Sequence, residues 1–259
     1  MRNLPKLLGC LGAGVAALTT SACNSTTDNT TDMTTQSATG VWSGNDSVTG
    51  LGVTGIVNSG GQAVFIRSDR ILFTGAVKIS SSTLVVALDG YPAFSSVFSD
   101  GSDHGIGTLS GTVMTRATLA ASLTFMTDGE SSLTGNWSLT YEPLSDTASS
   151  ATAISGDYTD VLTATTISIS TTGGMSGQNA SNSCTLSGSV SSADSTHNVY
   201  EVAFTYAGCT GTYAVLNGVQ FTGLATLNST LSPAVLLMAA TGTSGAGVPY
   251  GIVSSLNGS

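Results

Sequence analysis

The sequence predicts an all-β protein made of two tandem, related antiparallel units of about eight strands each. Short apolar or alternating runs, rich in Val, Ile, Thr and aromatic residues, recur beyond residue 39 between clusters of Gly, Ser, Asn and Asp. The chain has 32 Gly and only 5 Pro, a composition that suits tight turns in a closed sheet. The chain also aligns with itself at a nearly constant offset, which indicates an internal repeat.

The first 22 residues have the order of a secretory signal peptide. Two basic residues precede an apolar stretch over residues 7–18, and small side chains lead to Cys23. Ser21-Ala22-Cys23 resembles the end of a bacterial lipobox, in which the Cys becomes the lipidated first residue of the mature protein. Thr20 departs from the Leu, Val or Ile that lipoboxes favour, so cleavage without lipidation stays an alternative, as does an uncleaved anchor.

Residues 23–39 are expected to form the lipidated Cys and a flexible tether. Positions 24–39 contain seven Thr, little apolar bulk and no basic residue. In enteric bacteria an Asp after the Cys retains lipoproteins in the inner membrane, and Asn24 lacks that charge. By this resemblance we expect an exported protein on the bacterial outer membrane, facing the periplasm or the cell surface.

The internal repeat defines the two units. Two landmarks recur at an offset of 113, and two more recur at 112: residues 60–61 with 173–174, 73–77 with 186–190, 109–111 with 221–223, and Leu119 with Leu231. We read residues 40–146 and 152–259 as diverged copies of one β unit, separated by a Ser/Thr/Ala run. The same alignment makes Pro233 the start of a strand. Eight antiparallel strands can close into a barrel or form a sandwich, and closure removes exposed edges.

Strands are expected wherever apolar or alternating runs lie between turn residues. In the first copy they cover residues 52–57, 63–66, 71–79, 84–88, 107–113, 118–126 and 138–141. In the second copy residues 184–190 and 198–206 flank a turn-rich segment and predict a hairpin.

The cysteine pattern agrees with export. Cys10 lies in the signal peptide and Cys23 is assigned to the lipid, which leaves Cys184 and Cys209 as a pair for an oxidising compartment. Both are equally distant from a hairpin centre between Thr196 and His197, so a disulfide would clamp the open end of that hairpin. Two separate buried thiols are the alternative.

Most of the mature chain resembles a loose group of uncharacterised bacterial β-rich lipoproteins with two repeats. The resemblance lies in Gly40-Val-Trp42, the strand over residues 107–113, Cys184, Asn198-Val-Tyr200 and Cys209. It implies an exported β-rich lipoprotein and carries no catalytic residues. The Gly-x-Trp opening, repeated as Gly135-Asn-Trp137, also resembles lipocalin and avidin-like barrels. We expect the Trp to plug a barrel end, with contact to a ligand as the alternative.

Charge excludes a nucleic-acid-binding surface. Charged residues make up 8% of the chain, against about 25% in an average domain. The formal net charge is −9, and beyond residue 22 the only basic residues are Arg67, Arg70, Lys78 and Arg116. Binding to phosphates needs clustered Lys and Arg. Beyond residue 22 no apolar run reaches the roughly 20 residues of a spanning helix.

No motif predicts a catalytic, metal or cofactor site. Residues 50–55 fit G-x-G-x-x-G, but the following residues do not form the helix that dinucleotide binding needs. His104 and His197 are the only histidines, which excludes a multi-His zinc site. Residues 100–104 could hold Ca²⁺ weakly, but a solvated turn is the simpler interpretation. No G-x-S-x-G elbow occurs, and the carboxylate pairs stand beside turns.

These observations predict a non-catalytic, lipid-anchored envelope protein that presents two β modules for binding or envelope structure. Its partners would be the membrane, through the anchor, and an unidentified protein or glycan. The alternative is a carrier of a small apolar ligand in a barrel lumen, with a hydrolase as a third hypothesis. The lumen discriminates between them, because large apolar side chains would make a scaffold whereas small polar ones would make a pocket.

Overall fold

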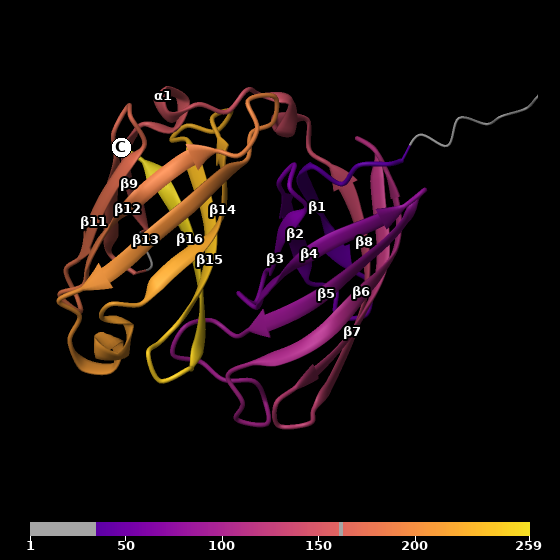
Figure 1. The fold of residues 1–259 in the computed structure, drawn as a ribbon, viewed down its shortest axis with the longest axis horizontal. Coiled ribbons are helices and arrows are strands. Elements are labelled where there is room, and N and C mark those ends of the chain that lie inside the picture. The colour runs from indigo at the N-terminus through magenta and orange to yellow at the C-terminus, as the bar shows by residue number, and fades with distance from the viewer. Residues whose placement is uncertain (1–34, 161–162) are drawn as a thin grey trace, which may run out of the picture. The chain divides into compact units, whose positions relative to one another are not determined.

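The computed structural model describes residues 35–160 and 163–259, and within them the chain forms two closed eight-stranded antiparallel barrels (Figure 1). The all-β prediction is therefore confirmed, and the sheets close as barrels rather than stacking as sandwiches. The first barrel contains β1 (Gly40–Asp46), β2 (Gly52–Val57), β3 (Gln62–Arg67), β4 (Leu72–Ser80), β5 (Thr83–Tyr91), β6 (Gly105–Met114), β7 (Thr118–Thr127) and β8 (Ser132–Tyr141).

The second barrel has the same up-and-down order, in which each strand pairs with its neighbours in the chain and the first strand pairs with the last. It contains β9 (Gly156–Asp160), β10 (Thr165–Ile169), β11 (Gly174–Asn179), β12 (Thr185–Ser192), β13 (Tyr200–Ala207), β14 (Gln220–Asn228), β15 (Val235–Thr243) and β16 (Pro249–Gly258). The short helices are η1 (Pro143–Asp146) and α1 (Ala151–Ile154), which lie in the connection between the barrels, and η2 (Gly211–Leu216).

Aromatic side chains fill the interior of the first barrel. Trp42 and Trp137 are almost fully buried, and each contacts other rings: Trp42 packs edge-on against Tyr141, and Trp137 lies 5.3 Å from Phe65 between ring centroids. The indole nitrogen of Trp42 donates a hydrogen bond to the carbonyl of Ala38 at 2.7 Å. The tryptophans therefore act as packing residues, as the sequence predicted, because bulky rings occupy the lumen of a barrel this narrow.

Four glycines of the repeat occupy matching positions at which neighbouring strands approach closely. A Cβ atom added to Gly75 or Gly188, in β4 and β12, would lie 2.1 or 2.0 Å from a carbonyl oxygen of the next strand. The same holds for Gly111 and Gly223 in β6 and β14, at 2.0 and 1.9 Å. The offsets of 113 and 112 therefore have a physical cause, because these positions tolerate only glycine where the neighbouring strand approaches so closely.

Two details of the expected alignment are wrong. Leu119 is fully buried in β7, whereas its expected counterpart Leu231 is half exposed in the turn before β15. Pro233 also lies in that turn, and the strand begins at Val235. The reason is turn length: β6 and β7 pair up to Met114 and Thr118, while the β14–β15 connection is longer and shifts the register of everything after it.

The residues just before β1 are hydrogen-bonded to the first barrel. The backbone nitrogen of Gln36 donates to the carbonyl of Ser81 at 3.0 Å, and that of Ser37 donates to the hydroxyl of Thr115 at 2.8 Å. Ala38 is buried. The last residues of the expected tether are thus held by the barrel, while Cys23 and the expected signal peptide lie outside the described residues. In the described ranges no helix has the length and apolar character needed to cross a membrane.

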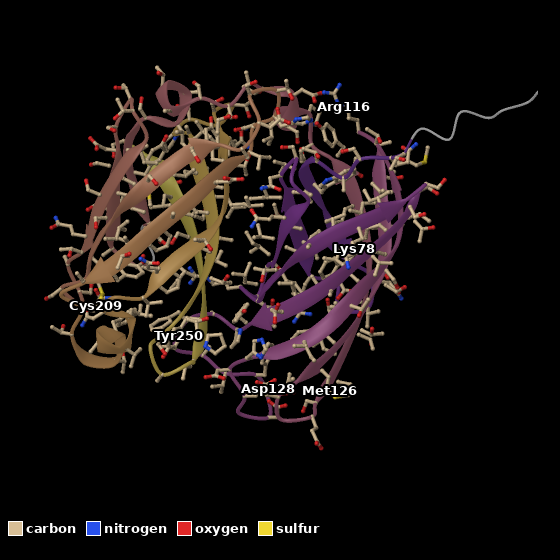
Figure 2. The ribbon with its side chains drawn as sticks, viewed as in Figure 1. Lys78, Arg116, Met126, Asp128, Cys209 and Tyr250 are labelled. Carbon is tan, nitrogen blue, oxygen red and sulfur yellow. A yellow bond between two sulfur atoms is a disulfide. The ribbon has the colours of Figure 1, made fainter. Side chains whose placement is uncertain are left out.

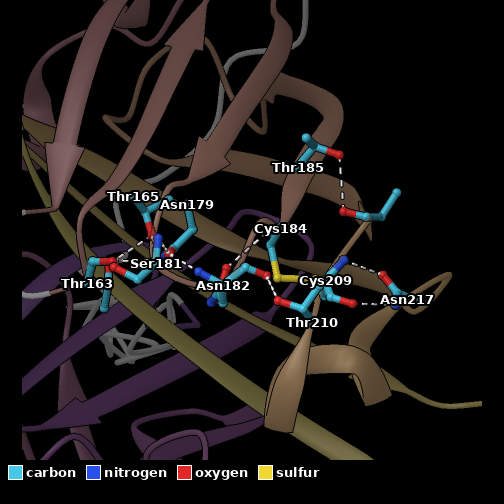
Figure 3. Close-up of a disulfide and its surroundings, with 11 residues drawn as sticks. Thr163, Thr165, Asn179, Ser181, Asn182, Cys184, Thr185, Cys209, Thr210 and Asn217 are labelled. Atoms are coloured by element: carbon cyan, nitrogen blue, oxygen red, sulfur yellow. Dashed lines mark hydrogen bonds between the residues drawn. A yellow bond between two sulfur atoms is a disulfide. The ribbon is translucent and has the colours of Figure 1, made fainter.

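A disulfide joins Cys184 to Cys209, as predicted (Figure 3). The hairpin register differs by one residue from the expected one, since Leu186 pairs with Tyr206 and the hairpin is centred on Thr196. Continuing this register places Gly208 opposite Cys184. Gly208 has φ 69°, so the chain turns there and brings Cys209 to within 4.0 Å of Cys184 between Cα atoms.

The outer faces of the two barrels meet in an apolar cluster. Ile56, Val64 and Leu72 on β2–β4 are buried although their side chains do not enter the first barrel's core cluster. They pack with Leu224 and Ala239 of β14 and β15. The side chain of Asn58 also donates to Glu201 at 2.9 Å. The described residues from 35 onward belong to one compact unit, so these contacts hold the first barrel against the second.

Replacing Gly111 with Ala should lower the free energy of unfolding by roughly 1–3 kcal/mol, because the added methyl group meets a backbone carbonyl that cannot move aside. Gly245→Ala is the matched control, since a Cβ at Gly245 has no neighbour within 4 Å. That variant should be neutral or slightly stabilising. Denaturant unfolding measures both, and equal midpoints for the two variants would contradict the close approach.

Replacing both Cys184 and Cys209 with Ala should lower the free energy of unfolding by about 3 kcal/mol, because the cross-link restricts the unfolded chain. Reductant should destabilise the wild-type protein by a similar amount and leave the double variant unchanged. Thiol labelling of unreduced, unfolded mature protein checks the bond directly, and two reactive thiols from these positions would refute it.

Candidate functional site

A cavity of about 260 Å³ lies at the side of the second barrel. Among the described residues β16 pairs with β9 at Asn257–Thr159 and Gly258–Tyr158. Residues 252–254 of β16 line the cavity.

The polar wall of the cavity is organised by Asn179 at the end of β11. Its amide nitrogen donates to the carbonyl of Thr163 at 2.6 Å and to the hydroxyl of Thr165 at 2.8 Å. Its amide oxygen accepts from the backbone nitrogens of Ser181 and Asn182. All four hydrogen-bonding positions of this side chain are used internally. Asn179 therefore shapes the wall but has no capacity left for a ligand.

The disulfide stiffens the neighbouring wall (Figure 3). Cys184 lines the cavity, and its backbone nitrogen donates to the side-chain oxygen of Asn182 at 3.0 Å. The carbonyl of Asn182 accepts from both the backbone nitrogen and the hydroxyl of Thr210, each at 2.9 Å. Since Thr210 follows Cys209, one covalent bond and two hydrogen bonds hold the two sides of the hairpin end together.

The first barrel supplies part of the cavity wall through the loop between β5 and β6. Phe94 in this loop packs against Tyr213 and Tyr250 of the second barrel, with ring centroids 4.9 and 5.9 Å apart (Figure 2 labels Tyr250). Phe98, four residues later, packs in the core of the first barrel, where its ring centroid lies 5.7 Å from that of Phe125. The loop is thus anchored in both barrels, which keeps Phe94 at the edge of the cavity.

Tyr206 places a neutral hydroxyl at the cavity. Its ring is 5.5 Å from Phe204 and 5.7 Å from Phe221 between centroids, so the side chain is held by the core. Burial, together with the nearby Tyr213 and Asp160, raises the pKa of Tyr206 to about 12. The hydroxyl therefore stays protonated at physiological pH and can donate a hydrogen bond to a ligand.

The described lining residues include one charged side chain, that of Arg70, and neither a His nor a carboxylate. The other described lining residues are hydroxyl, amide and apolar groups. The described lining therefore combines one positive charge with hydrogen-bonding and apolar groups.

The ionisable clusters lie elsewhere and are explained by local structure. His104 stands between Asp89 and Asp128 at 3.3 and 3.1 Å, and His197 pairs with Asp194 at 2.9 Å. Hydrogen bonds from the hydroxyl and backbone of the nearby Thr196 hold the pKa of Asp194 at about 2.

The sequence segment that raised the question of Ca²⁺ forms a hydrogen-bonded turn. Asp100 accepts bonds from Ser102, Thr127 and Ser131, which hold the pKa of its carboxyl well below the ordinary value. No group of three or more His, Cys, Asp or Glu side chains with a metal-binding arrangement occurs among residues 35–160 and 163–259.

The G-x-G-x-x-G segment forms ordinary strand structure. Its last glycine, Gly55, lies inside β2, where a Cβ would meet the ring of Phe65 at 2.9 Å. Asp69, at the spacing of a ribose-binding acid, instead forms an ion pair with Arg67 at 2.7 Å. The residues of the motif thus run into a strand and not into a helix, as the sequence predicted.

Of the sequence-predicted site residues, the structure brings Cys184 and Cys209 together beside the cavity, while Cys23 lies outside the described residues. The sequence did not reveal Arg70, Phe94 or Tyr206 as site residues. Each stands in a segment that reads as an ordinary turn or strand, and they meet only because the two barrels pack together. Only Asn179 and Asn182 could have drawn attention to the site from the sequence, because two amide side chains stand close before Cys184.

Comparison with known proteins adds no assignment. No protein-family model, curated protein or solved structure matches this chain.

Proposed function

We propose that the protein is an exported, lipid-anchored, non-catalytic envelope protein that binds a small ligand in the cavity at the side of the second barrel. The observation that carries the binding role is the cavity of about 260 Å³, which is lined by groups from both barrels. Its volume lies just below the usual range of small-molecule sites. The interior of the first barrel is filled by side chains, many of them aromatic. We therefore assign the first barrel the role of a scaffold that supplies part of the cavity wall.

The lining favours a partly polar ligand over a purely apolar one. Hydroxyl and amide groups from Thr163, Ser254 and Asn182 share the wall with Leu72 and Leu216. A purely apolar ligand would leave the polar groups without water or partners, which costs free energy. A ligand with one polar end and one apolar end satisfies both parts of the wall.

The proposed cellular location and the proposed attachment to a membrane are argued from the N-terminal sequence. The order of basic, apolar and small residues before Cys23, followed by a Thr-rich segment, supports export and lipidation. The Cys184–Cys209 bond supports an oxidising compartment. The resemblance to bacterial β-rich lipoproteins supports the same outer-membrane location. An anchored domain with a rigid, preformed cavity would capture small molecules close to the membrane.

Replacing Cys23 with Ala should release the protein from the membrane fraction, because no lipid can then be attached. Cys10→Ala is the matched control, since it removes a thiol from the expected signal peptide without touching the lipidation site. Fractionation and mass spectrometry of the mature N-terminus report the result. A membrane-bound Cys23→Ala protein, or an unmodified Cys23 in the wild type, would show that the anchor is wrong.

Filling the cavity should abolish ligand capture. Ala93 lines the cavity from the β5–β6 loop, so Ala93→Trp adds bulk inside it, whereas Ala120→Trp adds the same bulk to an exposed position of β7. Saturation-transfer NMR with a library of small partly polar fragments should find binders to the wild type that bind Ala93→Trp at least about 10-fold more weakly. Binding unchanged in Ala93→Trp, or no binder in the library, would exclude the cavity as the site.

A further inference from the structure

Arg70 is a cavity residue without a counter-charge. It lies in the turn between β3 and β4, where its backbone has φ 68°, and its backbone nitrogen donates to the carbonyl of Arg67. The nearest acid in sequence, Asp69, is already engaged by Arg67, which contacts it through two nitrogens at 3.0 and 2.7 Å. Arg70 therefore faces the cavity without the partner that its sequence position offers.

The other basic residues of the barrels show how unusual this placement is. Arg116 pairs with Asp146 at 2.9 Å, and Lys78 is exposed on β4 (Figure 2). Among the described residues no hydrogen bond or ion pair involves the guanidinium of Arg70. In a chain with a net charge of −9, a half-buried guanidinium beside a cavity attracts an anion over a short range. Salt screens the more distant negative charges beyond about 8–10 Å.

Hydrogen-bond donors complete the polar side of the cavity. Within the described part of the chain, the side-chain nitrogen of Asn182 and the hydroxyls of Tyr206 and Ser254 have no hydrogen-bond partner, and all three residues line the cavity. They can donate to oxygen atoms of a ligand. The apolar side is formed by Leu72, Leu216 and Phe94.

We propose that the cavity recognises a small monocarboxylate with an apolar or aromatic body, whose carboxylate pairs with Arg70. The proposal rests on the binding function proposed above and names the chemistry of the ligand. Arginine binds carboxylates through two parallel hydrogen bonds, and the apolar wall accepts the rest of the molecule.

The charge balance favours a carboxylate over a phosphate. Arg70 is the one cation among the described lining residues, which matches a single negative charge. A phosphate dianion would need more positive charge than the described lining supplies.

Benzoate, benzyl alcohol and phenyl phosphate are suitable probes, because they share a ring and differ in charge. Titration calorimetry should show that benzoate binds the wild type more tightly than the other two. Arg70→Met should weaken benzoate binding by about 10- to 100-fold, as expected for a charge-assisted contact. Lys78→Met is the matched control, since it changes the net charge equally on the same barrel, and it should change the affinity less than about twofold.

Each alternative result has a distinct meaning. Equal benzoate affinity in Arg70→Met and wild type would overturn the role of Arg70, and tighter binding of phenyl phosphate would overturn the ligand class. If benzyl alcohol binds as well as benzoate, charge recognition fails while the cavity's binding function stands. If benzoate does not bind but other fragments bind in a manner sensitive to Ala93→Trp, only the ligand class is wrong. Unfolding midpoints of both Met variants should match the wild type, which excludes a folding defect as the cause.

Discussion

The apolar contact between the outer faces of the two barrels is the interaction on which the candidate site depends. Ile56, Val64 and Leu72 would face water in an isolated first barrel, and their burial against Leu224 and Ala239 removes that exposure. Full burial of one such side chain is worth about 1.5–3 kcal/mol. The same contact brings the turn containing Arg70 and the β5–β6 loop to the second barrel. Without it, the cavity would lose the wall that carries its charge.

The two copies share their strand order and differ in the side chains that fill their cores. Both need glycine where a neighbouring strand approaches closely, as Gly75 and Gly188 show, and both have the same strand order. The first copy has two tryptophans in its core. The second contains no Trp, and Tyr200, Phe204 and Phe221 are the large rings of its core.

Several elements were predictable because the signal is local. Residues 52–57 became β2 with the same bounds, and the cysteines met because they flank one hairpin. The errors arose where a local irregularity interrupts the regular spacing of the strands. Leu231 was matched to Leu119, but the longer β14–β15 turn carries it into solvent. The hairpin centre was misplaced because Gly208 adopts a left-handed conformation that the spacing of the cysteines does not reveal.

The sequence by itself determined the fold class, the strand count, the duplication and the disulfide, because alternation, turn residues and cysteine spacing act over short distances along the chain. It could not determine why residues 63–66 are apolar on both faces. Only the tertiary structure shows that Val64 and Ile66 cover the second barrel while Phe65 enters the first. The candidate site likewise could not be predicted from the sequence. Arg70, Phe94 and Tyr206 come from three separate segments, and only the packing of one closed barrel against another brings them to one cavity.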